Sequence, residues 1–278
     1  VGVPEDEEYK ALQAELNALE QIDYERVNNA KLDLLHKAFD KTFKKLSATK
    51  GYQAFVEKNA HWLLPYAAFC VLRDLNGTPD FSQWKGYAKY NKKKVAAFCE
   101  EHKAEIDFWC FVQYHLDAQL SEVCAYAPSK GVVFKGDLPI GISRTSVDAW
   151  LYPELFHMDS QAGAPPDAFS ADGQNWGFPT YNWEKMAEDD FAWWKSRLAK
   201  MSEYFDAFRI DHILGFFRIW EIPLWTKSGL NGYFNPALPY PAHELASQGF
   251  DVTNFDLFME DPRKTGHYHP KIGAKSTQ

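Results

Sequence analysis

The chain has 278 residues, which at roughly 150 residues per domain fits one large domain or two small ones. A hydrophobic content of 46% with 24% charged residues is typical of globular proteins and excludes the disordered, collagen-like and coiled-coil classes. The formal net charge of −8 argues against nucleic acid as the main partner, because neutralising phosphates requires a basic surface. Aromatic residues, at 16%, are the unusual component.

The first 125 residues have the apolar periodicity of helices. Leucine, isoleucine and phenylalanine recur at helical spacing, with Glu and Lys on the other faces. The predicted helices cover about residues 12–22, 32–46, 52–75 and 91–124. The third ends at the turn sequence Asn76–Asp80, and the length of the fourth predicts a break near His102. We therefore expect a helical subdomain over residues 1–125.

The sequence shows no recognisable targeting signal or membrane-spanning segment. The residues Val1–Lys10 are acidic and lack the apolar core of a signal peptide. The longest apolar run, Trp62–Leu72, contains Pro65 and is far shorter than the ~20 residues that span a bilayer. Four cysteines without CxxC spacing lie inside helical patterns, as reduced core residues do: Cys70, Cys99, Cys110 and Cys124. We expect a cytoplasmic protein with no membrane partner.

The pattern changes at Gly131, where strands begin to alternate with other elements. Val132–Lys135 reads as a short buried strand and Ala207–Asp211 as a second one. Between them lie a long stretch rich in Gly, Pro, Asp and Trp, Ser143–Glu188, and a helix over about residues 190–204. Loops of this length are usually functional or disordered, and the aromatic content favours an ordered, functional one. The order strand, loop, helix, strand predicts an α/β fold with a parallel sheet.

Acidic residues stand at the ends of both predicted strands. Asp137 lies just past the first strand, and Asp211 lies at the tip of the second. In (β/α)8 barrels the carboxyl ends of the strands form the active face, so both are catalytic candidates. Arg209 and Asp211 are two residues apart, so both side chains point to one side, where the guanidinium favours the charged carboxylate. Such an aspartate suits a glycosidic nucleophile, although a structural Arg–Asp pair has the same pattern.

Tryptophan is concentrated around these strands. Eight of the ten Trp fall between Trp109 and Trp225, in the part of the chain that also holds the acidic excess. Carboxylates accept hydrogen bonds from sugar hydroxyls, and flat rings stack on the apolar faces of pyranoses, so the pattern fits a neutral, polyhydroxylated ligand. Indole rings buried in a large core are the alternative interpretation.

Several motifs, in the right order, resemble one enzyme family. The segment Phe205–Phe216 (FDAFRIDHILGF), followed by Trp220–Pro223 (WEIP), closely resembles the nucleophile segment of the amylomaltase or disproportionating-enzyme family, the 4-alpha-glucanotransferases of glycoside hydrolase family 77. Further similar segments are the strand-end motif Gly136–Ile140, the segment Ser146–Trp150 with Pro153–Phe156, the acceptor-site lid Ala162–Asp167 and Gly173–Gly177, and Ile22–Tyr24 and Trp62–Phe69 of the helical subdomain. The resemblance covers about residues 22–225.

The resemblance implies a fold and a division of the chain. It implies a partial (β/α)8 TIM barrel, an α/β fold, with a large helical subdomain in the N-terminal part. We expect the helical subdomain over residues 1–125, the barrel region with the nucleophile over 126–225, and the start of an insertion over 226–278. The segments Gly232–Pro239 and His269–Lys271 resemble the long-insert members of the family, in which a helical insertion separates the nucleophile from the acid/base.

Roles for the matching residues follow from the same resemblance. Asp211 would be the nucleophile that forms a covalent glucosyl-enzyme, and Arg209 would orient it. His212 would hold a hydroxyl of the sugar under attack, although strand alternation sends its ring away unless the strand has already ended. The other implied substrate-binding residues are Asp137, which would bind sugar hydroxyls, and Asp167, Gln174 and Trp176, which would line the glucan path and help to exclude water.

A retaining mechanism also requires a second carboxyl group as acid/base. The resemblance places it in a Glu-Asp-Leu-Gly-type segment on the next barrel strand. Glu260-Asp261 is superficially similar, but it follows no strand-like run, and Pro262 departs from the pattern. Glu221 has no role that transfers from the family. We therefore expect a truncated chain that ends inside the insertion and is inactive by itself.

The implied activity is the transfer of alpha-1,4-glucan segments from maltose or maltooligosaccharide donors to acceptors such as glycogen or soluble glucans. We predict no organic cofactor and no metal, because the simplest interpretation of His267-Tyr268-His269 is a solvated loop. A non-catalytic alpha-glucan-binding domain is the alternative. The intact Arg209–Asp211 pair favours the enzyme, since binding alone requires no charged nucleophile, and the lid motifs argue against an ordinary hydrolase.

Overall fold

The computed structural model describes residues 7–236, 239–254, 257–261 and 264–270. The chain divides into two compact units, Val1–Val132 and Val133–Gln278. The predicted boundaries at residues 125 and 225 stay predictions. No helix among the described residues is both long enough and apolar enough to cross a membrane.

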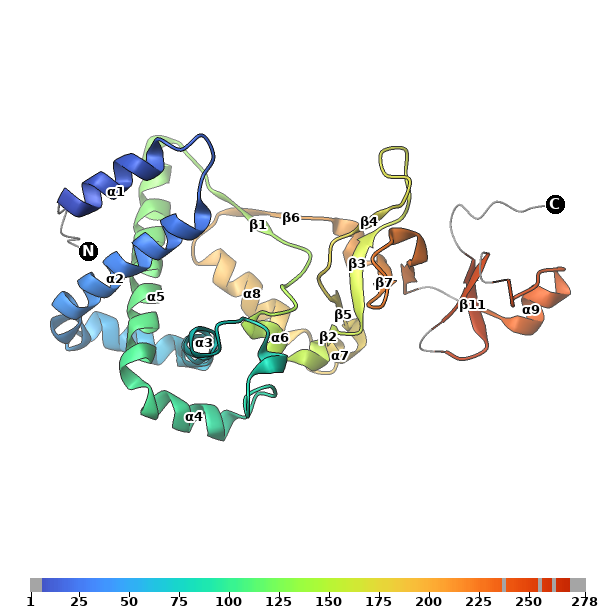
Figure 1. The fold of residues 1–278 in the computed structure, drawn as a ribbon, viewed down its shortest axis with the longest axis horizontal. Helices are drawn as coiled ribbons and strands as arrows, with labels where there is room; N and C mark the ends of the chain where they lie inside the picture. The colour runs from blue at the N-terminus through green and yellow to red at the C-terminus, as the bar shows by residue number, and fades with distance from the viewer. Residues whose placement is uncertain (1–6, 237–238, 255–256, 262–263, 271–278) are drawn as a thin grey trace. The chain divides into compact units, whose positions relative to one another are not determined.

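The first unit consists of helices, as the periodicity predicted. Its elements are α1 (Glu7–Asn17), α2 (Tyr24–Ser47), α3 (Lys50–Asn76), the short 3₁₀ helix η1 (Phe81–Gln83), α4 (Lys92–Glu101), α5 (Lys103–Tyr126) and η2 (Ala127–Lys130) (Figure 1). The break predicted near His102 is confirmed, because this residue separates α4 from α5. The Asp23 side chain caps α2 by accepting a hydrogen bond from the Arg26 amide.

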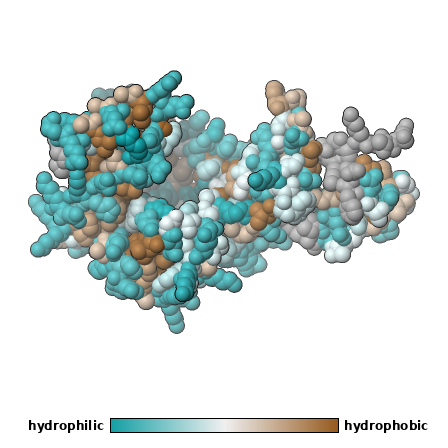
Figure 2. Space-filling model, viewed as in Figure 1, coloured by the Kyte–Doolittle hydropathy of each residue, from teal (hydrophilic) through white to brown (hydrophobic). Residues whose placement is uncertain are grey.

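The core of the helical unit forms where α2, α3 and α5 pack together. Ala38 of α2 and Phe111 of α5 are fully buried, and Phe39 packs edge-on against Phe108 and Phe111. On the face drawn in Figure 2, hydrophilic residues predominate over this unit, with hydrophobic residues visible between them. The unit therefore has an aromatic core of its own.

The second unit contains helices and strands. Its elements up to residue 202 are β1 (Lys135–Leu138), α6 (Val147–Leu151), η3 (Pro153–Leu155), β2 (Phe156–His157), β3 (Ser160–Ala164), β4 (Gln174–Asn175), β5 (Thr180–Tyr181), α7 (Trp183–Ala187) and α8 (Ala192–Ser202). Then follow β6 (Ala207–Ile210), η4 (Ile213–Phe216), β7 (Ile219–Pro223), η5 (Gly229–Asn231), β8 (Tyr233–Asn235), β9 (Tyr240–Pro241), α9 (Ala242–Ser247), β10 (Phe258–Glu260) and β11 (His267–Pro270).

The strands form small, separate sheets. β1 and β6 pair in parallel, as the strand order predicted, while β4, β3, β7 and β8 form an antiparallel sheet in that order. Two further sheets consist of β2 with β5, and of β10, β11 and β9. The segment expected to be a long loop, Ser143–Glu188, is therefore ordered into strands and short helices, and it contains both predicted lid segments, Ala162–Asp167 and Gly173–Gly177.

Two details of the predicted strands were wrong. The first strand lies at Lys135–Leu138 rather than Val132–Lys135, so Asp137 lies inside it and not just past it. Neither strand is buried throughout: all four residues of β6 are exposed, and so are Val132 and Val133. The apolar composition signalled strands correctly, but the register of β1 is set by hydrogen bonding to β6, where Gly136 lies opposite Phe208.

Candidate active site

An arginine bridge joins the two parallel strands. Asp137 of β1 and Arg209 of β6 are register partners, so their side chains leave the sheet at the same level. Arg209 Nε donates to Asp137 Oδ1 at 2.9 Å, and Nη2 donates to Oδ2 at 2.7 Å. This two-pronged geometry fixes the guanidinium plane more firmly than a single bond would.

The same guanidinium also lies beside Asp211. Arg209 Nη2 is 3.5 Å from Asp211 Oδ1, so the predicted Arg209–Asp211 pair is present, although Asp137 is the nearer partner. The Asp211 amide donates to the Leu138 carbonyl at 3.1 Å, which extends the strand pairing one residue beyond β6. The hydrogen bonds and charge of Asp137, followed by the charge of Asp211, raise the pKa of Arg209 above its usual value. All three side chains are about half exposed.

His212 leaves the strand geometry immediately after Asp211. Its φ of 51° is left-handed, and η4 follows, so the strand has ended where the sequence analysis required it to end. The Gly215 amide donates to the His212 carbonyl at 2.9 Å. A Cβ at Gly215 would lie 2.7 Å from the end of the Ile140 side chain and 3.0 Å from the His212 ring, so a larger residue here would require these side chains to shift.

Two lid residues, Trp176 and Gln174, form a chain of contacts that ends at His212. The Trp176 ring meets the His212 ring edge-on at 5.1 Å, and Trp176 Nε1 donates to Gln174 Oε1 at 3.0 Å. The Trp176 amide donates to the Ala162 carbonyl at 2.9 Å, which fixes the base of the side chain. The structure thus brings together Gln174, Trp176 and His212, and their predicted roles in binding the glucan stay predictions.

Asp167 has a different local setting. Its Oδ1 accepts from the amides of Phe169 and Ser170, both at 2.8 Å, so the carboxylate shapes the loop between β3 and β4. Phe169, at the tip of this loop, is 98% exposed. The predicted contact of Asp167 with the glucan path stays a prediction.

A pocket of about 310 Å³ opens beside His212. It is lined by Gly163, Ala164 and Pro165 of the lid, by His212, Leu214, Phe217 and Arg218, and by Trp220 and Phe234. Arg218 lies over the Phe234 ring at 4.1 Å. Phe217, Arg218 and Phe234 were not among the predicted site residues. The available sequence signal was that Phe217 and Arg218 directly follow the motif Phe205–Phe216.

Glu221 is a second feature that the motifs did not explain. It is 1% exposed in β7, and its carboxylate accepts from Thr180 Oγ1 at 2.8 Å and from Asn235 Nδ2 at 2.6 Å. Tyr233 donates at 3.3 Å, and His157 Nδ1 lies 3.5 Å away. A lone acid within the apolar run of β7 was the sequence signal for this buried network, which joins β2, β5, β7 and β8.

Two expectations for the C-terminal segment are corrected. A strand does precede Asp261, because Glu260 ends β10, where it accepts from the Gly266 amide at 2.7 Å. β10 pairs antiparallel with β11, so this strand lacks the parallel pairing of a barrel strand. His269 is buried rather than solvated: Nε2 lies 2.8 Å from Asp261 Oδ2, and the ring stacks on Tyr233. Pro262 lies outside the described residues.

Comparisons with known proteins identify the family of this chain. A family model described as 4-alpha-glucanotransferase matches residues 4–261. The chain is 48% identical to a rice protein named 4-alpha-glucanotransferase DPE2 and covers 28% of its length; with a 4-alpha-glucanotransferase of Chlamydia caviae the identity is 36% and the coverage 44%. These alignments include 91% and 86% of the chain. The chain thus spans less than half the length of these relatives.

A solved structure of a related enzyme is also similar to this chain. Amylomaltase from Streptococcus agalactiae, in complex with acarbose, superposes with a TM-score of 0.72 at 30% identity, covering 86% of this chain and 52% of that one. The helices and strands of the chain and this structural similarity define an α/β fold. Within that class, the chain belongs to the 4-alpha-glucanotransferase family, glycoside hydrolase family 77.

Proposed function

We propose that this chain carries the nucleophile region of a retaining 4-alpha-glucanotransferase. The observation that carries the proposal is the contact of one guanidinium, Arg209, with both Asp137 and Asp211. In this proposal β1 and β6 are neighbouring strands of a partial (β/α)8 barrel, and the helices α1–α5 are its N-terminal helical subdomain. Asp211, at the carboxyl end of β6, then lies where barrel enzymes place catalytic groups.

Asp211 acts as the nucleophile in the proposed reaction. Its carboxylate attacks the anomeric carbon of a donor glucan, the glycosidic C–O bond breaks, and the leaving oxygen takes a proton from a general acid. A hydroxyl of the acceptor glucan then attacks the glucosyl ester, passes its proton to the conjugate base and releases Asp211. Arg209 holds the attacking carboxylate in place throughout. We assign the acid/base role to none of the described carboxylates.

The remaining predicted residues bind the sugar. We propose that Asp137 and His212 hold hydroxyls of the glucosyl residue under attack, and that Gln174, Trp176 and Asp167 line the glucan path. Both Asp137 oxygens accept from Arg209, so this carboxylate also anchors the guanidinium. The lid would exclude water from the glucosyl ester, which favours transfer to a glucan over hydrolysis.

The proposed donors are maltose and maltooligosaccharides, and the proposed acceptors are glycogen or soluble glucans. The relatives named 4-alpha-glucanotransferase support this class of reaction over a non-catalytic glucan-binding domain. We also propose a cytoplasmic location, which the four cysteines without disulfides support.

Covalent labelling with alpha-maltosyl fluoride tests the nucleophile directly. Fluoride departs without protonation, so attack by Asp211 forms the glycosyl ester even without a general acid. We expect the intact mass of the chain to increase by one maltosyl group, and this increase to disappear in Asp211→Asn. Asp206→Asn is the matched control, since Asp206 is exposed just before β6 and has no proposed role. Equal labelling of Asp211→Asn and the wild type would contradict the assignment.

A further inference from the structure

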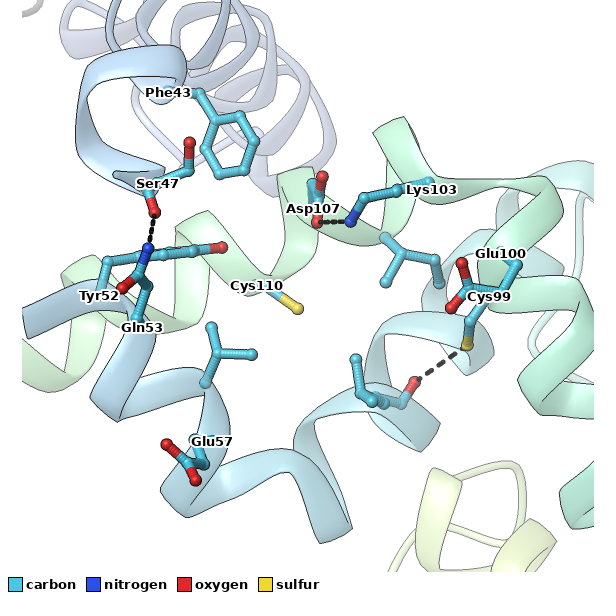
Figure 3. Close-up of a pocket in the computed structure, with 13 residues that line it drawn as sticks. Phe43, Ser47, Tyr52, Gln53, Glu57, Cys99, Glu100, Lys103, Asp107 and Cys110 are labelled. Atoms are coloured by element: carbon cyan, nitrogen blue, oxygen red, sulfur yellow. Dashed lines mark hydrogen bonds and ion pairs between the residues drawn. The ribbon is translucent and has the colours of Figure 1, made fainter. Parts of the chain in front are cut away.

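The helical unit contains a pocket of about 550 Å³ (Figure 3). Its walls come from the end of α2, from α3, and from the region where α4 meets α5. The lining residues are Phe43, Ser47, Tyr52, Gln53, Val56, Glu57, Leu64, Cys99, Glu100, Lys103, Ile106, Asp107 and Cys110. The volume is within the range of about 300–1,000 Å³ that is usual for small-molecule sites.

A buried tyrosine hydroxyl in this pocket has no hydrogen-bond partner. Tyr52 is only 6% exposed, and its hydroxyl makes no hydrogen bond within the described part of the chain. The ring is held edge-on by Phe43 at 5.7 Å and by Tyr114 at 5.3 Å, so the hydroxyl cannot easily turn away. In Figure 3 it points across the pocket towards Cys110 and Asp107. Buried polar groups are nearly always paired, so this hydroxyl points to a ligand.

The polar groups around the pocket exclude an anion. Lys103 Nζ lies 3.2 Å from Asp107 Oδ1, so the one lysine of the lining is neutralised by its neighbour. Glu57 and Glu100 are exposed and leave an excess of negative charge. An anionic ligand would meet these carboxylates without a free cation to balance them.

The inner end of the pocket is uncharged. Burial raises the pKa of the Cys110 thiol to about 12, and burial likewise raises the pKa of Tyr52, so both groups are protonated at neutral pH. Val56, Leu64 and Ile106 supply apolar wall. A cation bound at this inner end would lose its hydration. The carboxylates of Glu57 and Glu100 could not replace that hydration, because they belong to solvent-exposed residues. The inner end suits a neutral group that can accept and donate hydrogen bonds.

We propose that this pocket, which shares no residue with the candidate active site, binds a neutral, hydroxylated ring, such as one glucosyl residue of a glucan. A sugar hydroxyl accepts from Tyr52, other hydroxyls donate to Glu57 and Glu100, and the C–H face of the ring packs on the apolar walls. The inference rests on the pocket alone and holds whether or not Asp211 is a nucleophile. A site of this kind retains a glucan chain without cleaving it.

Hydrogen–deuterium exchange with maltose as the probe tests this site in the full chain. We expect maltose to protect peptides from residues 43–57 and 99–110. In Tyr52→Phe, the concentration needed for half-maximal protection rises about tenfold, the usual effect of losing one hydrogen bond to a ligand. The melting temperature of Tyr52→Phe does not fall, because the hydroxyl that it lacks has no partner among the described residues. Asp211→Asn keeps the protection.

Tyr66→Phe in α3 is the matched control. It makes the same chemical change in the same helix, and Tyr66 does not line the pocket. Unchanged protection in this variant, with weakened protection in Tyr52→Phe, supports the site. Absence of protection in residues 43–57 and 99–110, or equal protection in Tyr52→Phe, overturns it. Protection by tetramethylammonium as strong as that by maltose overturns the class of ligand. Protection confined to residues 174–178 and 209–214 would show that maltose binds at the candidate active site. This result would overturn the inference about the pocket and leave the proposed function standing.

Discussion

In the proposed mechanism, Arg209 acts through its geometry as well as its charge. Its fork contacts both oxygens of Asp137 and leaves Nη2 beside Asp211. A lysine keeps the charge but has no planar fork, so Arg209→Lys would leave Asp211 poorly oriented. We expect the rate of labelling by alpha-maltosyl fluoride to fall on the order of 100-fold, the effect of misplacing a reacting group by about 1 Å. Mass spectrometry over time measures this rate.

Arg26→Lys is the control for this substitution. Arg26 pairs with Glu15 at 2.6 Å in the helical unit, where loss of the fork has no consequence for the site. We expect its labelling rate to equal that of the wild type. If Arg209→Lys were labelled as fast as Arg26→Lys, the positioning role of Arg209 would be excluded.

Glu221 stabilises the second unit through four neighbours. Replacing it with alanine removes the acceptor of the buried donors of Thr180 and Tyr233 and of the half-buried Asn235 amide. We expect Glu221→Ala to lower the free energy of unfolding by about 3 kcal/mol or more, as breaking buried charged networks does. Urea unfolding measures the change. The exposed Glu184 of α7 provides the comparison, since Glu184→Ala should cost under about 0.5 kcal/mol. Equal losses in the two variants would contradict a stabilising role for the network.

The sequence predicted the positions of helices and longer strands better than it predicted how the strands pair. Helical periodicity located α2 to α5 and the break at His102, because it reports which face of each helix packs. Strand composition located β6, but it placed β1 three residues early, because partner hydrogen bonds and not side chains decide the register. The strands β2 to β5 within Ser143–Glu188 are only two to five residues long, too short for alternation to be detected.

The same distinction applies to the candidate site, where local geometry was predictable from the sequence and long-range contacts were not. Strand alternation alone placed Arg209 and Asp211 on one side, since that geometry is local. The bond from Arg209 to Asp137 spans 72 residues of sequence, and no local pattern contains it. The direction of the His212 ring depends on its left-handed φ. Histidine rarely adopts this conformation, and the sequence alone does not predict it.

Close packing of the lid strands makes Gly163 a sensitive position. A Cβ there would overlap the Gln174 carbonyl across the β3–β4 pair and approach Ile222 at 2.7 Å. We expect Gly163→Ala to separate β4 from β3, to displace Trp176, and to destabilise the protein by roughly 1–3 kcal/mol. Thermal unfolding measures the loss, and tryptophan fluorescence reports the displacement.

Gly51→Ala makes the same change where there is room. In the first turn of α3, the added Cβ meets only Tyr114 at an ordinary 3.6 Å, and alanine favours helix. We expect this variant to be as stable as the wild type or slightly more stable. A loss in Gly51→Ala equal to that in Gly163→Ala would show that the lid contact is not the cause.

The second unit exposes seven large apolar side chains in the segment from β6 to just past β7. They are Phe208, Ile210, Ile213, Leu214, Phe217, Leu224 and Trp225, each at least 37% exposed. Exposed strand edges and apolar patches favour association between copies. We expect sedimentation velocity to show concentration-dependent self-association of the chain, which Trp225→Ser weakens. A monomer at all concentrations up to about 100 µM would contradict this expectation.

The bridge between Asp137 and Arg209 also determines when the site can form during folding. These residues are 72 positions apart, and the chain between them contains the whole lid. Closing so large a loop has an entropic cost, which is lower once the intervening chain has become compact. Lid hairpins such as β3–β4 are local and can form first, whereas pairing of β1 with β6 is a late, long-range event. The nucleophile would therefore acquire its guanidinium partner only near the end of folding, so that a partly folded chain carries the aspartate without the arrangement that makes it reactive.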